Sequence, residues 1–162
     1  MISQIYQTGF LLVFSLLIST AFAQNDSILV GKVNRAELQK DHFGQLFLEE
    51  YKQYHPNNEL LENFGSDLYD LEIILVMATW CHDSQLQVPR FFKILDLLNY
   101  NTSEIDIYTV DKQKLCGDFD ISNFNIELVP TFIFYRDGAE IGRIIESPLY
   151  TLEKDMLMML ND

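Results

Sequence analysis

The hydrophobic positions of residues 35–54 fall three or four residues apart, with charged residues between them, which is typical of an amphipathic helix. Pro56 ends this pattern, because the residue before a proline disfavours helical backbone. Asn57 then caps a short second helix that stops at Gly65. The stretch before these helices, residues 24–34, is polar and mixed, and we expect it to be a flexible lead.

From residue 71 onward the pattern alternates between strands and helices. The apolar, branched run of residues 71–78 predicts a strand buried on both faces. Asp137 and Gly138 predict a hairpin turn between the last two strands. The expected strands are 71–78, 105–110, 131–135 and 139–145, and the expected helices are 88–98, 121–126 and a segment that begins near Pro148. This order of elements predicts an α/β fold with a mixed sheet.

Residues 1–23 have the features of a signal peptide. They contain no charged side chain, and residues 10–18 form an apolar run about half as long as a membrane-spanning helix needs. Residues 21–23 (Ala-Phe-Ala) match the pattern that signal peptidase recognises, although the positive residue usual near the N-terminus is missing. An uncleaved anchor is the alternative. We predict an exported chain, periplasmic or secreted, that begins at Gln24 and is not stably inserted in a membrane after cleavage.

Composition and charge limit the size of the domain and its partners. With 162 residues, 48% of them hydrophobic, the chain is long enough for one domain with a real core. It has 11 Lys and Arg against 24 Asp and Glu, a formal net charge of -13, which repels phosphate backbones and anionic lipids. We therefore expect no nucleic-acid partner and no binding to membrane surfaces.

The cysteine and histidine residues do not form a metal-binding pattern. Cys81 and Cys116 are too few for a disulfide scaffold or a structural zinc site. His42 and His55 have no partner at metal-ligand spacing, so we expect both on the surface and predict no metal site.

Cys81 and the preceding Trp80 stand where a buried strand is expected to meet a helix. At the helix N-terminus the free backbone N–H groups and the helix dipole stabilise a thiolate, which is the nucleophile in disulfide exchange. The alternative is a small buried cysteine at a turn. The polar residues that follow, His82, Asp83 and Ser84, favour an open site instead.

Residues 80–84 (Trp-Cys-His-Asp-Ser) resemble the Trp-Cys-x-x-Cys motif of the thioredoxin family, with Ser84 in place of the second cysteine. Pro89 falls where this family often kinks the active-site helix. Val129-Pro130-Thr131 resembles the cis-proline loop of the family, at the start of a strand that leads into a hairpin. These features occur in the order of the family, so the match is more specific than the Trp-Cys pair alone.

The resemblance covers roughly residues 71–160 and implies the thioredoxin fold, a mixed central sheet flanked by helices. Residues 24–66 would then be an N-terminal lead and helical extension, and residues 67–162 the thioredoxin-like domain. The Val129–Pro130 bond would be cis, with Pro130 beside Cys81. The resemblance also implies that an extended peptide binds this edge, over Trp80, Val129, Pro130 and Thr131.

Three departures from the family change the expected chemistry. Ser84 can donate a hydrogen bond to a thiolate but cannot attack a mixed disulfide. The buried acid that the family carries six residues before its first cysteine is Leu75 here, and its lysine partner falls at about Ile107. An acid–base pair is thus replaced by an apolar pair, and the fast two-cysteine reductase cycle is not expected.

Two further residues have open roles. Cys116 follows the 105–110 strand, and parallel neighbouring strands would bring it to the same sheet edge as Cys81. It could resolve a mixed disulfide only if the two Cα atoms come within about 7 Å; the alternative is an incidental loop thiol. His82 could stabilise the thiolate when protonated, while Asp83 would oppose it; the alternative is that both face solvent.

Two functions therefore compete. The first is exported thiol–disulfide exchange through one nucleophilic cysteine, with Cys81, His82 and Ser84 as catalytic residues and no cofactor. Its partners would be client protein thiols or disulfides and an external thiol reductant, favouring isomerisation or deglutathionylation over net reduction. The second is a non-catalytic module of thioredoxin fold that holds extended peptides in the manner of a chaperone.

Overall fold

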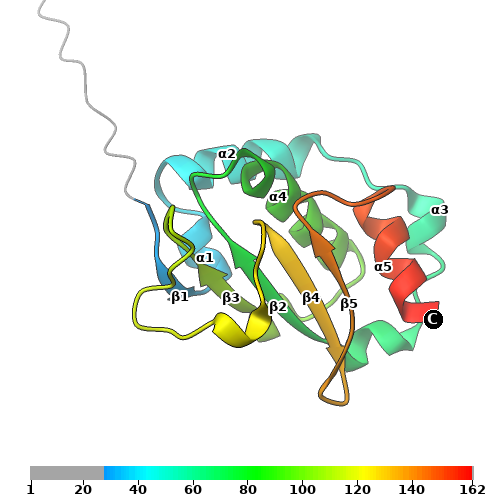
Figure 1. Cartoon of the computed structure of the whole chain (residues 1–162). Helices are drawn as coiled ribbons and strands as arrows, with labels where there is room; N and C mark the ends of the chain where they lie inside the picture. The colour runs from blue at the N-terminus through cyan, green and yellow to red at the C-terminus, as the bar shows by residue number, and fades with distance from the viewer. Residues whose placement is uncertain (1–27, 162) are drawn as a thin grey trace, which may run out of the picture.

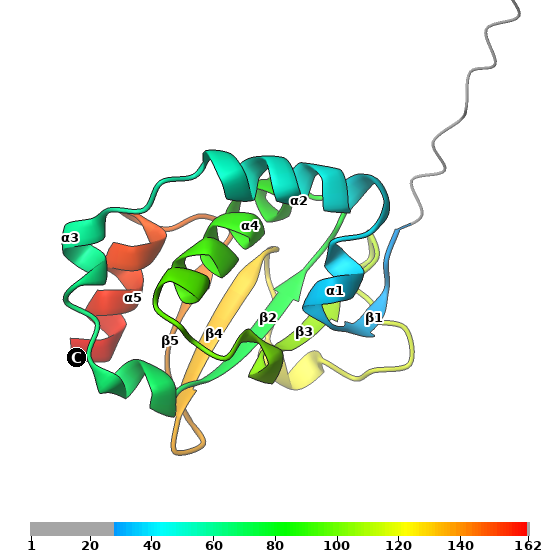
Figure 2. The same ribbon diagram turned by 180° about the vertical axis from the view of Figure 1, so that it is seen from behind.

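A computed structural model describes residues 28–161, which form a five-stranded sheet with its main helices packed on one face (Figure 1). The view from behind in Figure 2 shows α2 and α4 in front of the sheet. In chain order the elements are β1 (Gly31–Val33), α1 (Arg35–Leu38), α2 (Asp41–Gln53), α3 (Asn58–Leu61), the 3-10 turn η1 (Ser66–Asp70), β2 (Glu72–Met77), α4 (His82–Leu97), the 3-10 turn η2 (Thr102–Glu104), β3 (Asp106–Thr109), the 3-10 turn η3 (Ser122–Phe124), β4 (Thr131–Arg136), β5 (Ala139–Ile145) and α5 (Leu152–Asn161).

The strands lie in the order β1-β3-β2-β4-β5. β2 and β3 are parallel and are joined by α4 as a crossover helix. β4 is antiparallel to β2 and turns into β5 through Asp137 and Gly138, whose φ angles of 52° and 76° suit a tight hairpin. The predicted α/β fold with a mixed sheet is confirmed.

The two faces of the sheet bury two separate cores. Side chains alternate along β2, so that Ile73, Leu75 and Met77 belong to the core under the helices, whereas Val76 belongs to the opposite core. Residues of α2, α4 and α5 complete the first core. The connection between β3 and β4, which includes η3, covers the second face (Figure 1). Both faces of the central strand are thus protected from water, as its continuous apolar run predicts.

The prediction of a flexible lead over residues 24–34 was wrong for its last part. Gly31–Val33 forms the edge strand β1, antiparallel to β3, and the Thr109 hydroxyl donates to the Gly31 carbonyl at 3.0 Å. The strand has only three residues, and the partner that pairs with it lies far along the chain. Its local hydrophobic pattern is therefore too short to predict it.

The single helix expected over residues 35–54 is divided into α1 and α2. The chain turns at Gln39 and Lys40, and Asp41 opens α2 with a positive φ of 54°. A Cβ at Gly44 would lie 2.3 Å from the Gln39 carbonyl carbon, so only glycine allows the two turns to approach this closely. The hydrophobic spacing continues across the break, which is why the pattern did not show it.

These N-terminal helices pack into the main core. Phe47 on α2 is fully buried, stacks on Tyr51 and contacts Phe92 of α4. Arg35 of α1 forms a bidentate ion pair with Asp96 of α4, with both N–O distances 2.6 Å. Residues of the 24–66 extension are thus part of the same core as the later elements. The predicted signal peptide, 1–23, and Gln24 lie outside the described residues.

The later elements differ from the predictions only in their limits. The short helix expected over 121–126 is the single turn η3, and the last helix begins at Leu152 rather than near Pro148. The Asp155 carboxylate accepts hydrogen bonds from the backbone N–H groups of Leu149 and Tyr150, which holds the preceding turn outside the helix. Within residues 28–161, no helix is long and apolar enough to cross a membrane.

Candidate active site

Cys81 lies at the N-cap of α4, directly after the turn that follows β2. Its backbone is extended, its N–H donates to the Ala78 carbonyl at 3.1 Å, and its own carbonyl accepts from the Gln85 N–H at 3.0 Å. The side chain is partly exposed, so a dissolved disulfide can reach Sγ. A residue at this position lies beside the free backbone N–H groups of the first helical turn.

The Cys81 thiol points to the loop that precedes β4. Its Sγ–H donates to the Val129 carbonyl at 3.1 Å, and the Val129–Pro130 peptide bond is cis. Thr131 opens β4, and its hydroxyl donates to the Leu128 carbonyl at 2.7 Å, closing the turn around Pro130. The structure therefore brings Cys81, Val129, Pro130 and Thr131 together at one end of the sheet.

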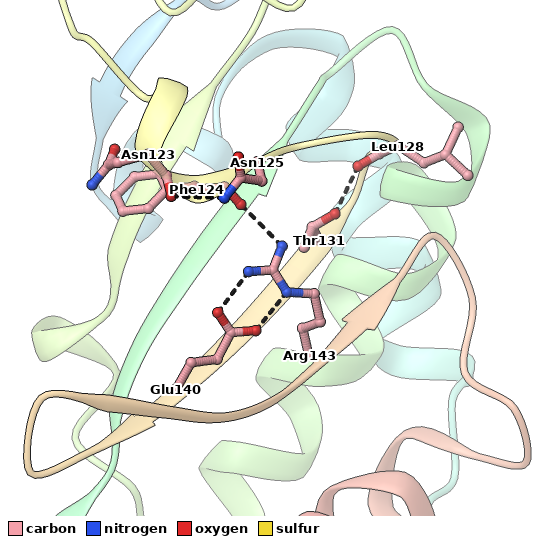
Figure 3. A network of polar contacts seen from close by, with 7 residues as sticks. All are labelled: Asn123, Phe124, Asn125, Leu128, Thr131, Glu140 and Arg143. Atoms are coloured by element: carbon pink, nitrogen blue, oxygen red, sulfur yellow. Dashed lines mark hydrogen bonds and ion pairs between the residues drawn. The ribbon is translucent and has the colours of Figure 1, made fainter.

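Arg143 on β5 braces the segment that leads into this loop (Figure 3). Its guanidinium donates to the two Glu140 carboxylate oxygens at 2.5 and 2.6 Å and to the Phe124 carbonyl at 2.9 Å. Figure 3 shows the Arg143 side chain reaching from β5 to η3. The sheet edge thus holds η3 in place shortly before the cis-proline loop. Sequence reasoning did not find this arginine, because its partner Phe124 contributes only a backbone atom.

Trp80 lies beside Cys81, and a hydrogen bond from its indole fixes the position of its side chain. Its Nε1–H donates to the Val110 carbonyl at 3.1 Å, at the end of β3. The partly buried ring packs, as Cys81 does, against the core on the second face of the sheet. The indole is therefore a rigid wall of the site.

Cys81 is partly exposed, stands at the start of the crossover helix and faces a cis-proline loop. The sheet beneath it has the strand order β1-β3-β2-β4-β5. The chain has a thioredoxin-like fold. No protein-family model matches it.

Comparisons with known proteins found several that are similar to this chain. Thioredoxin H9 of Arabidopsis thaliana is 29% identical over 84 residues, which are 52% of this chain and 56% of that protein. The chain thus spans little more than half the length of this curated relative. A protein of unknown function from Pseudomonas aeruginosa has a TM-score of 0.48 at 14% identity, over 73% of this chain and 81% of that one. Oxidised thioredoxin O2 of Arabidopsis thaliana has a TM-score of 0.42 at 21% identity, over 62% of this chain and 84% of that one.

Ser84 lies three residues after Cys81, in the first turn of α4, and is fully buried. Its hydroxyl oxygen accepts a hydrogen bond from the Ala78 N–H at 3.2 Å, which ties the first turn of α4 to the end of β2. Within the described residues no hydrogen bond joins it to Cys81. The side chain therefore supports the turn that carries Cys81.

Leu75 and Ile107 are neighbours across the parallel strands β2 and β3, as the resemblance to the thioredoxin family implies. Both are at most 1% exposed, and Phe132 lies opposite Leu75 on β4. The buried side chains at these two positions are thus apolar. No titratable side chain there can move a proton to or from a leaving thiol.

Cys116 is a poor resolving thiol in this conformation. It is 2% exposed and packs in the core of the second face, on which Cys81 also rests, and the two cysteines are not bonded to each other. Burial raises the pKa of the Cys116 thiol, and the backbone N–H of Gly31 offsets only part of this rise. A buried thiol of raised pKa provides little thiolate for attack.

His82 is exposed at the first position of α4. It borders a shallow hollow of about 170 Å³ that also includes Glu49 and Glu50 of α2. Asp83 is partly buried in the same first turn, where an acidic side chain suits the helix dipole. His82 thus faces solvent, as the alternative to a tuning role expects, whereas Asp83 does so only in part.

A larger cavity of about 460 Å³ lies on the other side of Trp80, against α1 and the start of α2. His42 lines it and is partly buried, which corrects the prediction of a surface histidine, whereas His55 is exposed as predicted. The ring is drawn inward because the residue after it, Phe43, packs in the core. The apolar run Ile28, Leu29 and Val30, within a mixed lead, is the sequence signal for this cavity.

Proposed function

We propose that this thioredoxin-like chain carries out thiol–disulfide exchange through a single nucleophilic cysteine, Cys81. The observation that carries the proposal is the 3.1 Å contact between its Sγ and the Val129 carbonyl, which holds a partly exposed sulfur beside a cis-proline loop. An extended peptide that pairs with this loop would present its own disulfide to Sγ. In this proposal Trp80, Val129, Pro130 and Thr131 form the peptide-binding surface.

The reaction consists of two exchanges. The Cys81 thiolate attacks one sulfur of a client disulfide, a bond forms between them, and the other client sulfur leaves as a thiolate and takes up a proton. A second client thiol then attacks the mixed disulfide and returns Cys81 as a thiolate, so the client is isomerised with no net oxidation or reduction. When an external low-molecular-weight thiol attacks the Cys81 sulfur instead, the client leaves reduced and the small thiol is bonded to Cys81. A second molecule of that thiol then frees Cys81 as a thiolate and forms a low-molecular-weight disulfide.

The absence of a nearby resolving thiol favours isomerisation over rapid reduction. Ser84 carries no sulfur, and Cys116 is buried with a raised pKa. Release of the client then depends on a thiol from outside the chain. Such a protein acts where disulfides form, and the predicted signal peptide supports export to the periplasm or beyond the cell.

His82 and Ser84 assist Cys81 in different ways in this proposal. An exposed imidazole next to the nucleophile adds positive charge when it is protonated, which stabilises the thiolate, whereas Asp83 acts against it. The Ser84 hydroxyl can still donate its own proton while it accepts from the Ala78 N–H, so it can turn to a thiolate when one forms.

Peptide binding without catalysis is a second candidate function. The observation that favours it is the apolar pair Leu75 and Ile107, which leaves the site without the buried acid and base of its family. The same cis-proline loop and the rigid Trp80 would then hold an extended client that Cys81 does not attack.

Trapping of a peptide distinguishes the two functions. A Cys116→Ser chain is mixed with a peptide whose single cysteine forms a mixed disulfide with thionitrobenzoate, and covalent adducts are weighed under non-reducing conditions. We expect one adduct on Cys81 that persists until a small thiol is added, and none on a Cys81→Ser chain. Peptide binding by the Cys81→Ser chain with no adduct on the parent chain would instead support the non-catalytic module.

A further inference from the structure

The cavity beside Trp80 is separate from the surface on which Cys81 opens. Its walls come from the first described residues, the junction of α1 and α2, the Thr79–Trp80 turn and one side chain of α4. Its volume of about 460 Å³ lies in the range of cavities that enclose a ligand. Three of its lining residues, Thr79, Trp80 and Gln85, are close neighbours of Cys81 along the chain. The cavity and the nucleophile therefore share one wall.

The innermost part of the lining is apolar. The inner wall is formed by Leu38, Phe43 and Leu29, of which the first two are only 1% and 7% exposed. On the side of Cys81, the Trp80 Nε1–H is already bonded to a backbone carbonyl, and the Gln85 side-chain amide donates to the Thr79 carbonyl at 2.9 Å. These groups stiffen the wall on the side of Cys81. Elsewhere in the lining, the buried Nδ1 of His42 has no hydrogen-bond partner within the described residues.

The charged residues at the rim of the cavity favour neither an anionic nor a cationic ligand. The charged lining residues are Lys40 and Lys112, which are positive, and Glu37 and Asp41, which are negative. Their formal charges cancel, so an anionic or a cationic ligand gains little from this rim. The discriminating feature of the occupant is thus its apolar surface.

We propose that this cavity is a specificity pocket for a large apolar side chain, aromatic or long aliphatic, that lies next to the reacting cysteine of a client. This inference rests on the proposed exchange function. A client sulfur bonded to Cys81 places the neighbouring client residue one chain step away, and Trp80, which lines the pocket, is one step from Cys81. Once the client is tethered, entry of its side chain is intramolecular, so a modest apolar contact suffices.

Rates of exchange with model peptides test the pocket. Each peptide carries one cysteine as a mixed disulfide with thionitrobenzoate, with either Phe or Gly next to the cysteine. Cys81 attacks the peptide sulfur, a Cys81–peptide disulfide forms, and thionitrobenzoate leaves as a coloured thiolate because it is the better leaving group. In a Cys116→Ser chain we expect the Phe peptide to react about tenfold faster than the Gly peptide, after correction for their rates with a free thiol.

Two neighbouring variants provide the matched comparison. Ile28 lines the pocket and Val30 does not, although they are 40% and 39% exposed, so neither substitution threatens the core. Ile28→Glu is expected to reduce the preference for Phe to less than twofold, while Val30→Glu retains it. No preference in the parent chain, or the same preference in the Ile28→Glu chain, would overturn the proposal.

A second measurement separates failure of the pocket from failure of the exchange chemistry. Trp80 is the only tryptophan of the chain and lines the pocket, so its fluorescence reports occupancy. A Cys81→Ser chain titrated with a peptide bearing Ser in place of Cys should change its emission with the Phe peptide and not with the Gly peptide. A response to Phe without exchange would contradict the proposed function alone. If a chain starting at Ile28 binds the Phe peptide more tightly than one starting at Gln24, the chain's own N-terminal residues occupy the pocket, which overturns the proposal.

Discussion

At the scale of single residues, the site has the partly exposed thiol of Cys81, and its neighbour Ser84 has no thiol that could release a client bound to Cys81. The Trp80 and Cys81 pair is local, so the sequence could place the nucleophile at a strand–helix junction. Its bond to the Val129 carbonyl joins residues 48 positions apart and exists only because β2 and β4 are paired. The bond of Ser84 to the Ala78 N–H likewise depends on how the turn folds, and residue types alone do not reveal it.

Restoring a second thiol at position 84 should shorten the life of trapped complexes. Ser84→Cys places a sulfur one helical turn after Cys81, so a mixed disulfide can be attacked within the chain rather than by an external thiol. We expect the adduct in the trapping experiment to decay at least tenfold faster than in the parent chain. Ser66→Cys, on exposed η1, is the control and should leave the lifetime unchanged. Equal lifetimes for Ser84→Cys and the parent would contradict the single-cysteine mechanism.

At the scale of elements, the helix α2 and the strand β5 hold the site from two sides. The amphipathic pattern of residues 35–54 predicted helix and its buried face, since both follow from spacing. The break before α2 requires the close approach at Gly44, which spacing does not encode. The Arg143 side chain on β5 also bonds to a backbone carbonyl, that of Phe124. A bond to a backbone atom does not depend on the residue type of the partner, so the sequence does not predict it.

Asp96 makes the attachment of α1 and α2 to α4 sensitive to pH. Burial alone would raise the pKa of Asp96, but hydrogen bonds from Arg35 and Tyr51 outweigh it and hold the pKa below its ordinary value of 3.8. The stabilisation is therefore complete above pH 3.8 and is lost as the pH falls through the lowered pKa. Asp96→Asn should lower the free energy of unfolding by about 1–2 kcal/mol at neutral pH.

Urea unfolding of the two chains at several pH values measures this effect. The difference between Asp96→Asn and the parent should shrink as the pH falls below 3.8, because the parent carboxylate then becomes neutral as well. Asp67→Asn, at an exposed position of η1, is the control. A loss of the same size at every pH would show that the charge of Asp96 is not responsible.

Removal of the Arg143 contacts should increase the mobility of η3, which precedes the cis-proline loop, without unfolding the chain. Arg143→Gln breaks the pair with Glu140 and the bond to the Phe124 carbonyl, so amides of η3 should exchange hydrogen several-fold faster. Lys154→Gln, on exposed α5 surface, is the control. Hydrogen exchange followed by mass spectrometry makes the comparison, and unchanged η3 protection would mean that the brace is dispensable.

At the scale of the whole molecule, the site lies at one end of the sheet, against the core of its second face. Strand and helix patterns predicted the sheet and the crossover, because long apolar runs carry strong signals. They could not predict that residues 28–33 run beside the Thr79–Trp80 turn, where the Leu29 N–H donates to the Thr79 hydroxyl at 3.4 Å. Contacts of this kind join short segments to distant elements, and they are known only from the folded chain.

Export of the chain remains a prediction from its N-terminal residues. If signal peptidase recognises residues 21–23, the mature chain starts at Gln24, four residues before Ile28. The intact mass of protein recovered from the periplasm or medium of an expressing cell measures the cleavage point directly. A mass that retains Met1 would refute cleavage and favour the uncleaved anchor.

The central claim is that the fold activates Cys81, and the alkylation rate of this one thiol tests it most directly. In a Cys116→Ser chain, iodoacetamide uptake at neutral pH is followed by mass for the native chain and for the same chain unfolded in urea. The account predicts that the native thiol reacts several-fold faster, although it is the less exposed, because the helix N-terminus favours the reactive thiolate. A native Cys81 that reacts no faster than the unfolded one would contradict the exchange mechanism.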